Sequence, residues 1–238
     1  NGMNKKFIFT FFNVVSYVFL LVCSFFINGK TAFSVAGAQP LITPAPYAFL
    51  IWIIIYLLFG IWIIRFGFKS TEYDVAYQKV SRFIPLVFCF AGGSLLVGQP
   101  IAVFCIIGSL LMTVFSYISC RHATSKSSFF RVPLSVYLSW ISIASLIETL
   151  IVLKSRWGVE LFGLSETFWT IFLLMFIGFI AITILSTQQD FIYPSVIIWA
   201  SIGIAMNHLN HASIFITCCG VILLIGLMMD YMKRITEK

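Results

Sequence analysis

The chain has 238 residues, of which 61% are hydrophobic and 10% are charged, and its mean hydropathy is +1.04. An ordinary soluble domain carries about 25% charged residues, so the composition excludes that class. The formal net charge is +7, but no basic stripe interleaved with aromatic residues lies outside the loops, which argues against a nucleic-acid partner. The composition therefore predicts a multi-pass protein whose main partner is the lipid bilayer.

Apolar segments long enough for the roughly 30 Å hydrocarbon core of a membrane recur through the whole chain. They lie at 7–28, 47–65, 83–98, 100–120, 132–153, 167–187, 191–207 and 211–232. The expected fold class is therefore all-α, a polytopic membrane helix bundle with about eight transmembrane helices. The third and seventh segments are short, so six or seven full spans with a re-entrant piece is the alternative.

The connections between these segments carry two further signals. Residues 66–82 mix charges with Ala76, Tyr77 and Val80, which recur at helical spacing and predict a short amphipathic helix on the membrane surface. The proline-rich loop 29–46 is the longest on the outer side, and loops of that length often cover a site. We therefore expect a lid there.

The distribution of Lys and Arg predicts the orientation. With the N-terminus inside, only Lys30, Lys154 and Arg156 face outward, and the other basic residues face inward. Cytoplasmic flanks hold the excess of Lys and Arg. We therefore expect a cell-membrane protein with both termini in the cytoplasm.

Tryptophans near the ends of the spans are typical of interfacial aromatic belts. Four tryptophans lie at such positions, and we expect them to act as anchors at the membrane surface: Trp62, Trp157, Trp169 and Trp199.

The second span is more aromatic than crossing lipid requires. At about 100° per residue, one face of it collects four rings and a small residue. These residues are Phe49, Trp52, Tyr56, Phe59 and Gly60. Such a wall either packs a bundle or lines a ligand cavity.

The fifth span places an aromatic pair and a carboxyl on one face, because Tyr137, Trp140, Ala144 and Glu148 fall within an arc of about 80°. Glu148 is the only acidic residue well inside a predicted span, and such groups usually face a cavity or a partner. It lies on the same side as the turn that contains His208 and His211. A single carboxylate with His-x-x-His is weak evidence for metal, and we expect no metal site.

These two spans resemble the tryptophan-rich sensory protein family, also called the translocator protein or TspO family. In that family the second helix follows Trp-x-Pro-Pro and carries Trp-x-x-x-Tyr-x-x-x-Gly, and the fifth carries Pro-Tyr-Leu-x-Trp-x-Ser-x-Ala-Thr before an Asn. The matching residues here are Pro44, Trp52, Tyr56 and Gly60 in the first motif and Tyr137, Leu138, Trp140, Ser142, Ala144 and Ser145 in the second. Glu148 stands where the family has Asn, and Ala91-Gly92-Gly93-Ser94-Leu95 stands where the third helix usually has Asn and Trp.

The resemblance implies a TspO-like five-helix core over residues 1–156. Residues 157–238 then form three additional transmembrane helices packed on that core, as in a longer, eight-helix branch. Members of the family often form homodimers, so a homodimer is also expected.

The resemblance also implies a cavity between the first loop and helices two and five that binds porphyrins and other flat hydrophobic molecules. The ligand-binding residues that follow are Pro44, Tyr47, Phe49, Trp52, Tyr56, Tyr137, Trp140, Ala144 and Glu148. A porphyrin or haem would enter as the ligand, and no resident cofactor follows from the sequence.

Three functions stay open. The leading expectation is an integral membrane binding protein, a sensor or receptor for a flat hydrophobic ligand. The second is a proton-coupled secondary transporter of a small molecule that uses Glu148. The third is a light-dependent porphyrin-oxidising enzyme, which rests on the resemblance of Trp52 and Trp140 alone. The sequence contains no pattern that names a catalytic residue.

Overall fold

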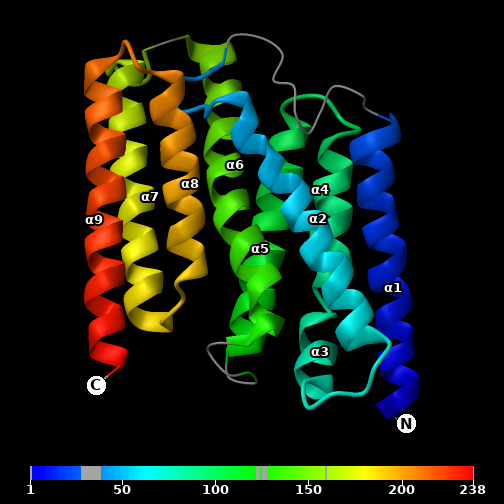
Figure 1. The fold of residues 1–238 in the computed structure, drawn as a ribbon. Coiled ribbons are helices and arrows are strands. Elements are labelled where there is room, and N and C mark those ends of the chain that lie inside the picture. Colours follow the sequence, from blue (N-terminus) through cyan, green and yellow to red (C-terminus); the bar gives the residue numbers. More distant parts are fainter. Residues whose placement is uncertain (1, 28–38, 122–123, 125–127, 159, 238) are drawn as a thin grey trace. The chain divides into compact units, whose positions relative to one another are not determined.

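A computed structural model describes residues 2–27, 39–121, 124, 128–158 and 160–237 of the chain (Figure 1). In these residues the regular elements are helical, and the only β contact is an isolated bridge between Leu161 and Leu164. The α-helices are α1 (Gly2–Val22), α2 (Ile51–Trp62), α3 (Asp74–Val80), α4 (Ile84–Ser94), α5 (Ile101–Arg121), α6 (Val132–Trp157), α7 (Glu166–Gln188), α8 (Ile192–Asn207) and α9 (Ala212–Thr236). The all-α expectation is confirmed.

Shorter helical turns extend several of these helices. A π-helical turn η1 (Cys23–Ile27) continues α1, and a second, η3 (Ile63–Gly67), continues α2. A 3-10 turn η2 (Pro46–Leu50) precedes α2, and a 3-10 turn η4 (Phe129–Arg131) precedes α6. Each of the eight predicted segments therefore contains a helix.

Six helical segments in the described part of the chain are long and apolar enough to cross a membrane. They are Asn4–Phe26, Pro46–Gly67, Ile101–Arg121, Phe129–Trp157, Glu166–Gln188 and Ala212–Thr236. The helices α4 and α8 are apolar but shorter, and they are the third and seventh segments that the sequence already marks as short. A polytopic membrane bundle is thus confirmed, and eight full crossings stay a prediction.

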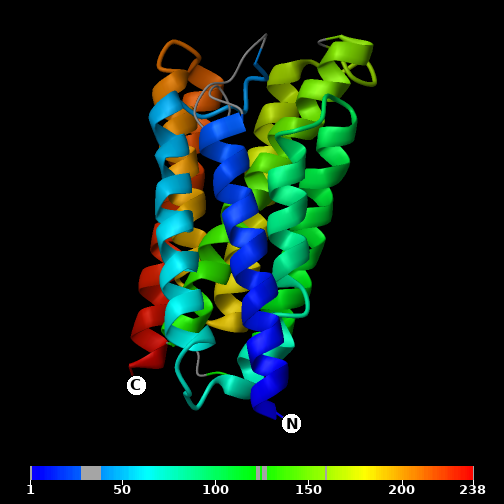
Figure 2. The same cartoon turned by 90° about the vertical axis from the view of Figure 1, so that its right-hand side faces the viewer.

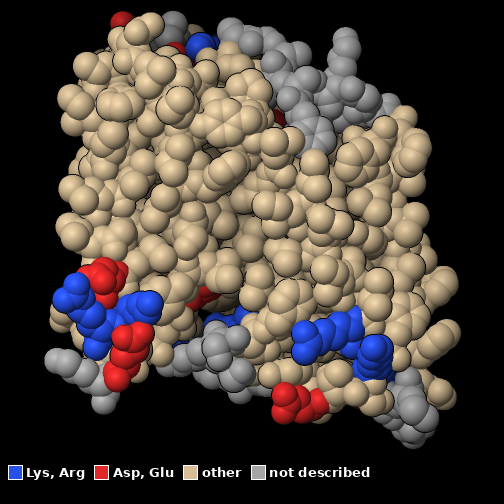
Figure 3. Space-filling model, viewed as in Figure 1, with Lys and Arg blue, Asp and Glu red and all other residues tan. Residues whose placement is uncertain are grey.

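The outward faces of the long helices carry large apolar side chains. Phe104 on α5 is 68% exposed and Ile216 on α9 is 67% exposed. Most of the surface drawn in Figure 3 is uncharged. An exposed apolar surface of this kind is compatible with the hydrocarbon core of a membrane. The protein therefore contacts lipid along these helices.

The chain folds into two compact units. The first consists of Asn1–Ala32 and Ile51–Ile141, and the second consists of Phe33–Leu50 and Ser142–Lys238. The second unit joins the last three helices with the residues that lead into α2. The boundary expected at residue 156 stays a prediction.

In the first unit, α4 packs against both α1 and α5 (Figure 2). Trp62 lies in the core of this unit, where its indole N–H donates a hydrogen bond to the Phe130 carbonyl at 3.1 Å. Its side chain is fully buried, so the prediction that Trp62 anchors the membrane interface is wrong. A position near a helix end indicates how deep a side chain lies in the membrane, but not whether it faces lipid or protein. The Trp62 indole faces the protein.

The predicted amphipathic helix is α3, and a ladder of polar contacts holds it on α1. Lys6, Thr10 and Asn13 are four and three residues apart, so they share one face of α1. The Lys6 ammonium lies 2.6 Å from an Asp74 carboxylate oxygen, and Thr10 and Asn13 lie 3.0 and 2.9 Å from the Tyr77 hydroxyl. Tyr77 is fully buried. The two helices are therefore fixed to each other by polar as well as apolar contacts.

In the second unit, α7, α8 and α9 each pack against the other two (Figure 1). The helix α6 ends just before Gly158, whose φ of +80° favours glycine. The next helix, α7, begins at the Ser165 side chain, which accepts a hydrogen bond from the Phe168 amide at 3.2 Å. This cap satisfies one of the free amides at the helix start.

Candidate functional site

The nine predicted ligand residues are divided between the two units. The first unit holds Trp52, Tyr56, Tyr137 and Trp140. The second unit holds Pro44, Tyr47, Phe49, Ala144 and Glu148. Each group has its own surroundings.

Trp52 is the centre of the aromatic cluster in the first unit. Its ring centroid lies 5.7 Å from that of Tyr56 and 6.0 Å from that of Tyr137. Phe59, two turns along α2 from Trp52, has its ring centroid 5.9 Å from that of Tyr137. These separations are typical of favourable aromatic pairs. The predicted face of α2 thus meets α6 through Tyr137.

The tyrosines of this cluster are buried and their hydroxyls are engaged. The Tyr56 and Ser24 hydroxyls lie 2.7 Å apart, and the Tyr137 and Ser109 hydroxyls lie 2.6 Å apart. Tyr137 and Trp140 are fully buried, whereas Trp52 is only half-buried. Trp52 is therefore the partly exposed member of the cluster, and the buried tyrosines pack against it.

The indole N–H of Trp52 has no hydrogen-bond acceptor among the residues that the structure describes. A donor without a partner in apolar surroundings is costly. An acceptor on a ligand or a water molecule would relieve that cost. The cluster thus offers apolar ring faces and one donor, a combination suited to a planar molecule with a few polar atoms.

Gly60, the last residue of the first motif, has a packing role. A Cβ atom placed there would lie 2.9 Å from the Tyr17 hydroxyl. That hydroxyl donates a hydrogen bond to the Tyr56 carbonyl at 2.6 Å. The small residue therefore lets α1 approach α2, as small residues do at helix contacts in membranes.

The residues before α2 are bound to α8 in the second unit. The Ala45 amide donates to the Gly203 carbonyl at 2.9 Å, and the Trp199 indole N–H donates to the Ala48 carbonyl at 3.0 Å. The Asn207 amide donates to the Thr43 carbonyl at 3.1 Å. These bonds hold the segment on α8 through its own backbone groups.

Two of the predicted ligand residues belong to this contact. Tyr47 packs edge-on against the Trp199 ring, with 6.0 Å between centroids. Pro44 is buried, and its Cβ lies 2.9 Å from where a Cβ on Gly203 would be. In this unit they fix the segment to α8. Trp199 serves the same contact, which the anchor prediction did not anticipate.

The sequence contained a signal for this contact that was missed. Trp199, Gly203 and Asn207 are each four residues apart, so they form one stripe along α8. An aromatic donor, a glycine and an amide on one stripe of an apolar helix indicate a close backbone neighbour.

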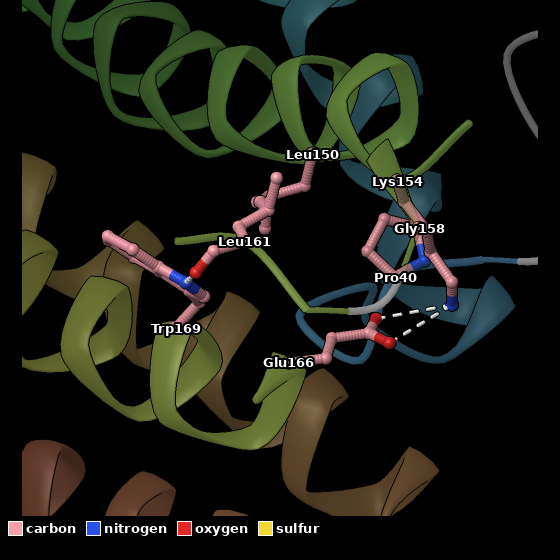
Figure 4. Close-up of a pocket in the computed structure, with 7 residues that line it drawn as sticks. All are labelled: Pro40, Leu150, Lys154, Gly158, Leu161, Glu166 and Trp169. Atoms are coloured by element: carbon pink, nitrogen blue, oxygen red, sulfur yellow. Dashed lines mark hydrogen bonds and ion pairs between the residues drawn. The ribbon is translucent and has the colours of Figure 1, made fainter. Parts of the chain in front are cut away.

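An ion pair ties the same segment to α6 and α7 (Figure 4). The Lys154 ammonium lies 3.1 Å from a Glu166 carboxylate oxygen, and the other oxygen accepts a hydrogen bond from the Leu41 amide at 2.8 Å. Beside it, Trp169 donates its indole N–H to the Leu161 carbonyl at 3.0 Å. Lys154, Glu166, Leu161 and Trp169 line a cavity of about 10 Å3, which is room for about one water molecule.

The C-terminal part of the expected lid, residues 39–46, is thus held in place within the second unit by these hydrogen bonds. Residues 29–38 lie outside the described residues.

Ala144 and Glu148 are half-buried on α6. At the turn between α8 and α9, the His208 and His211 rings lie 6.3 Å apart. In the described part of the chain, no group of three His, Cys, Asp or Glu residues is placed to hold a metal ion.

Comparison with known proteins agrees with the two motifs. The chain matches the TSPO-like protein family over residues 6–231, a range that reaches from α1 into α9 and so includes α7 and α8. No curated protein and no solved structure matches the chain. Because the family match covers nearly the whole chain, this protein belongs to the TSPO-like protein family.

Proposed function

We propose that this protein is a membrane-embedded binding protein or sensor for a flat hydrophobic ligand such as a porphyrin. The observation that carries the proposal is the Trp52 indole, half-buried among the Tyr56 and Tyr137 rings with its N–H free of a described acceptor. Membership of the TSPO-like family supports it. Trp140 and the two tyrosines back the binding surface.

The remaining predicted residues extend the proposal. Pro44, Tyr47 and Phe49 position the segment that leads into α2, and Ala144 and Glu148 lie further along α6. The protein resides in the cell membrane with both termini in the cytoplasm, as the distribution of Lys and Arg favours. A homodimer is part of the same proposal.

A titration with protoporphyrin tests the binding role. The shift of the porphyrin absorption band gives the affinity without depending on which tryptophans are present. Trp52→Phe removes the free indole N–H, and a hydrogen bond of this kind contributes about 1 kcal/mol. We expect the affinity to fall about five-fold.

Trp62→Phe is the matched control, because Trp62 lies on the same helix but is fully buried and donates to Phe130. This variant is expected to lose stability and keep its porphyrin affinity. Equal affinities for wild type and Trp52→Phe would make the cluster a packing element and end the proposal.

A further inference from the structure

A groove lies between α1 and α3 at the end of the first unit where α1 begins. It has a volume of about 410 Å3, within the range of about 300–1,000 Å3 that is typical of ligand sites. It lies apart from the Trp52 cluster and shares no residue with it.

The groove has a basic rim and an apolar floor. On α1, Lys5, Ile8 and Phe9 line it, and spacings of three and four residues place them on one helix face. From α3 and the turn after it come Val75, Lys79 and Arg82, which are spaced by four and three residues. Two helices thus present the same combination of cationic and apolar side chains to one groove.

The groove is preformed, because polar contacts already hold its two helices together. The contacts of Asp74 with Lys6 and of Tyr77 with Thr10 and Asn13 fix α3 on α1 along the adjacent face. Asn13 also donates to the Ser81 hydroxyl at 2.8 Å, directly before Arg82. Binding therefore requires little ordering of the backbone.

The three cations of the rim are available to an anion. Lys5, Lys79 and Arg82 are exposed, and none forms an ion pair with another residue that the structure describes. The carboxylate of α3, Asp74, is already bound by Lys6. Below the rim, Ile8 is 52% exposed and Val75 is 66% exposed. Among the described residues, the groove thus has neither a counter-anion nor an apolar cover.

We propose that this groove binds one anionic glycerophospholipid. Its phosphodiester lies among Lys5, Lys79 and Arg82, and the first carbons of an acyl chain lie along Ile8, Phe9 and Val75. A phospholipid supplies the missing charge and the missing apolar cover in one molecule, whereas a free phosphate supplies the charge alone. The start of a membrane-spanning helix is also where a lipid headgroup is found.

Native mass spectrometry of the full-length protein in detergent tests the site, with phosphatidylglycerol as the probe and phosphatidylcholine as the zwitterionic comparison. A basic residue near anionic lipid contributes about five-fold in affinity. The double variant Lys79→Gln/Arg82→Gln is therefore expected to bind phosphatidylglycerol on the order of 25-fold more weakly. Val75→Ser is expected to weaken binding with no change in net charge.

The control is Lys233→Gln/Arg234→Gln on α9, which removes the same charge from residues that are also exposed. It is expected to keep wild-type affinity. An equal loss in the control, equal affinity for phosphatidylcholine, or displacement of the lipid by inorganic phosphate would each overturn the proposal. If the double variant does not fold, Lys5→Gln on α1 provides the same test, with an expected loss of about five-fold.

Discussion

The Tyr137 hydroxyl and the Ser109 hydroxyl lie 2.6 Å apart between α6 and α5, and both side chains are fully buried. Ser109 donates its own proton to the Val87 carbonyl at 2.9 Å, so the tyrosine is the donor in the pair. The chain of contacts from Tyr137 through Ser109 to Val87 joins three helices of the first unit. It holds the Tyr137 ring against Trp52.

A double-mutant cycle on this pair measures the coupling. Tyr137→Phe and Ser109→Ala each leave a buried group without its partner, which costs about 1–3 kcal/mol. We expect the double variant to lose less stability than the sum of the single losses, since the same bond is removed in each. Thermal unfolding in detergent is the measurement, and strictly additive losses would contradict the coupling.

Gly203→Ala tests the attachment of the segment before α2. The new Cβ would lie 2.9 Å from the Cβ atoms of Pro44 and Ala48, and overpacking of this kind costs about 1–3 kcal/mol. We expect a lower unfolding temperature and faster hydrogen exchange at Ala45, whose amide is bonded to Gly203.

The control for that substitution is Gly220→Ala in α9, where a Cβ meets nothing within 4 Å. Alanine is a better helix former than glycine by about 1 kcal/mol, so this variant is expected to be at least as stable as wild type. The same effect at both glycines would show that the contact with Pro44 and Ala48 has no energetic weight.

The contact between Lys6 and Asp74 makes the first unit sensitive to acid. Burial raises the pKa of the Asp74 carboxyl, but hydrogen bonds from Lys6 and from the Thr71 amide and the charge of Lys6 outweigh it, so the pKa lies below its usual range. Stability from a lowered carboxyl pKa is complete above the unfolded value of about 3.9 and is lost as the pH falls through the folded value. We expect wild type to be destabilised over that acidic range.

Asp74→Asn should remove that pH dependence and lower stability at neutral pH by about 1.5–3 kcal/mol, the contribution of a hydrogen bond to a charged group. Asp230→Asn is the control, since its ion pair with Arg234 lies on the exposed surface of α9 and such pairs contribute little. Unfolding measured against pH distinguishes the two. Parallel pH profiles for wild type and Asp74→Asn would contradict the assignment.

Glu148→Gln separates a binding protein from a proton-coupled transporter. The amide keeps nearly the same shape but cannot ionise, and the matching position in the family is Asn. We expect porphyrin affinity to be retained within about two-fold, because glutamine keeps the shape and the carbonyl acceptor of the side chain and removes only its ability to ionise. Loss of proton-driven uptake in liposomes by a folded Glu148→Gln protein would instead favour the transporter.

The orientation is tested with single cysteines in a background that lacks the six native ones. Ser70→Cys and Asn210→Cys both place a thiol at an exposed position. Impermeant reagents are expected to label position 210 from outside and position 70 only after the membrane is opened, as the distribution of Lys and Arg predicts. Labelling in the reverse order would invert the topology.

Periodicity predicted the helices well because the spacing of apolar residues within one segment already shows which face of the helix is buried. The apolar spacing of Ala76, Tyr77 and Val80 predicted α3, and all three side chains are buried as expected. Length also marked α4 and α8 as the short segments. These features depend on neighbours three or four residues away, which a sequence displays directly.

Contacts between distant residues could not be read in the same way. Trp62 looked like an interface anchor because its acceptor, the Phe130 carbonyl, is 68 residues away. The roles of Ser24 and Ser109 as partners of the cluster tyrosines likewise depend on which helices are neighbours. Among the tryptophans of the two motifs, the sequence could not distinguish half-buried Trp52 from fully buried Trp140.

The hydrogen bonds between α8 and residues 43–48 join two segments that are synthesised at different times. Thr43, Ala45 and Ala48 leave the ribosome 151 to 164 residues before their partners Asn207, Gly203 and Trp199. Until then these early backbone groups must find water, lipid headgroups or a chaperone. The segment that leads into α2 is therefore made well before its partners on α8, and its hydrogen bonding is completed only after them.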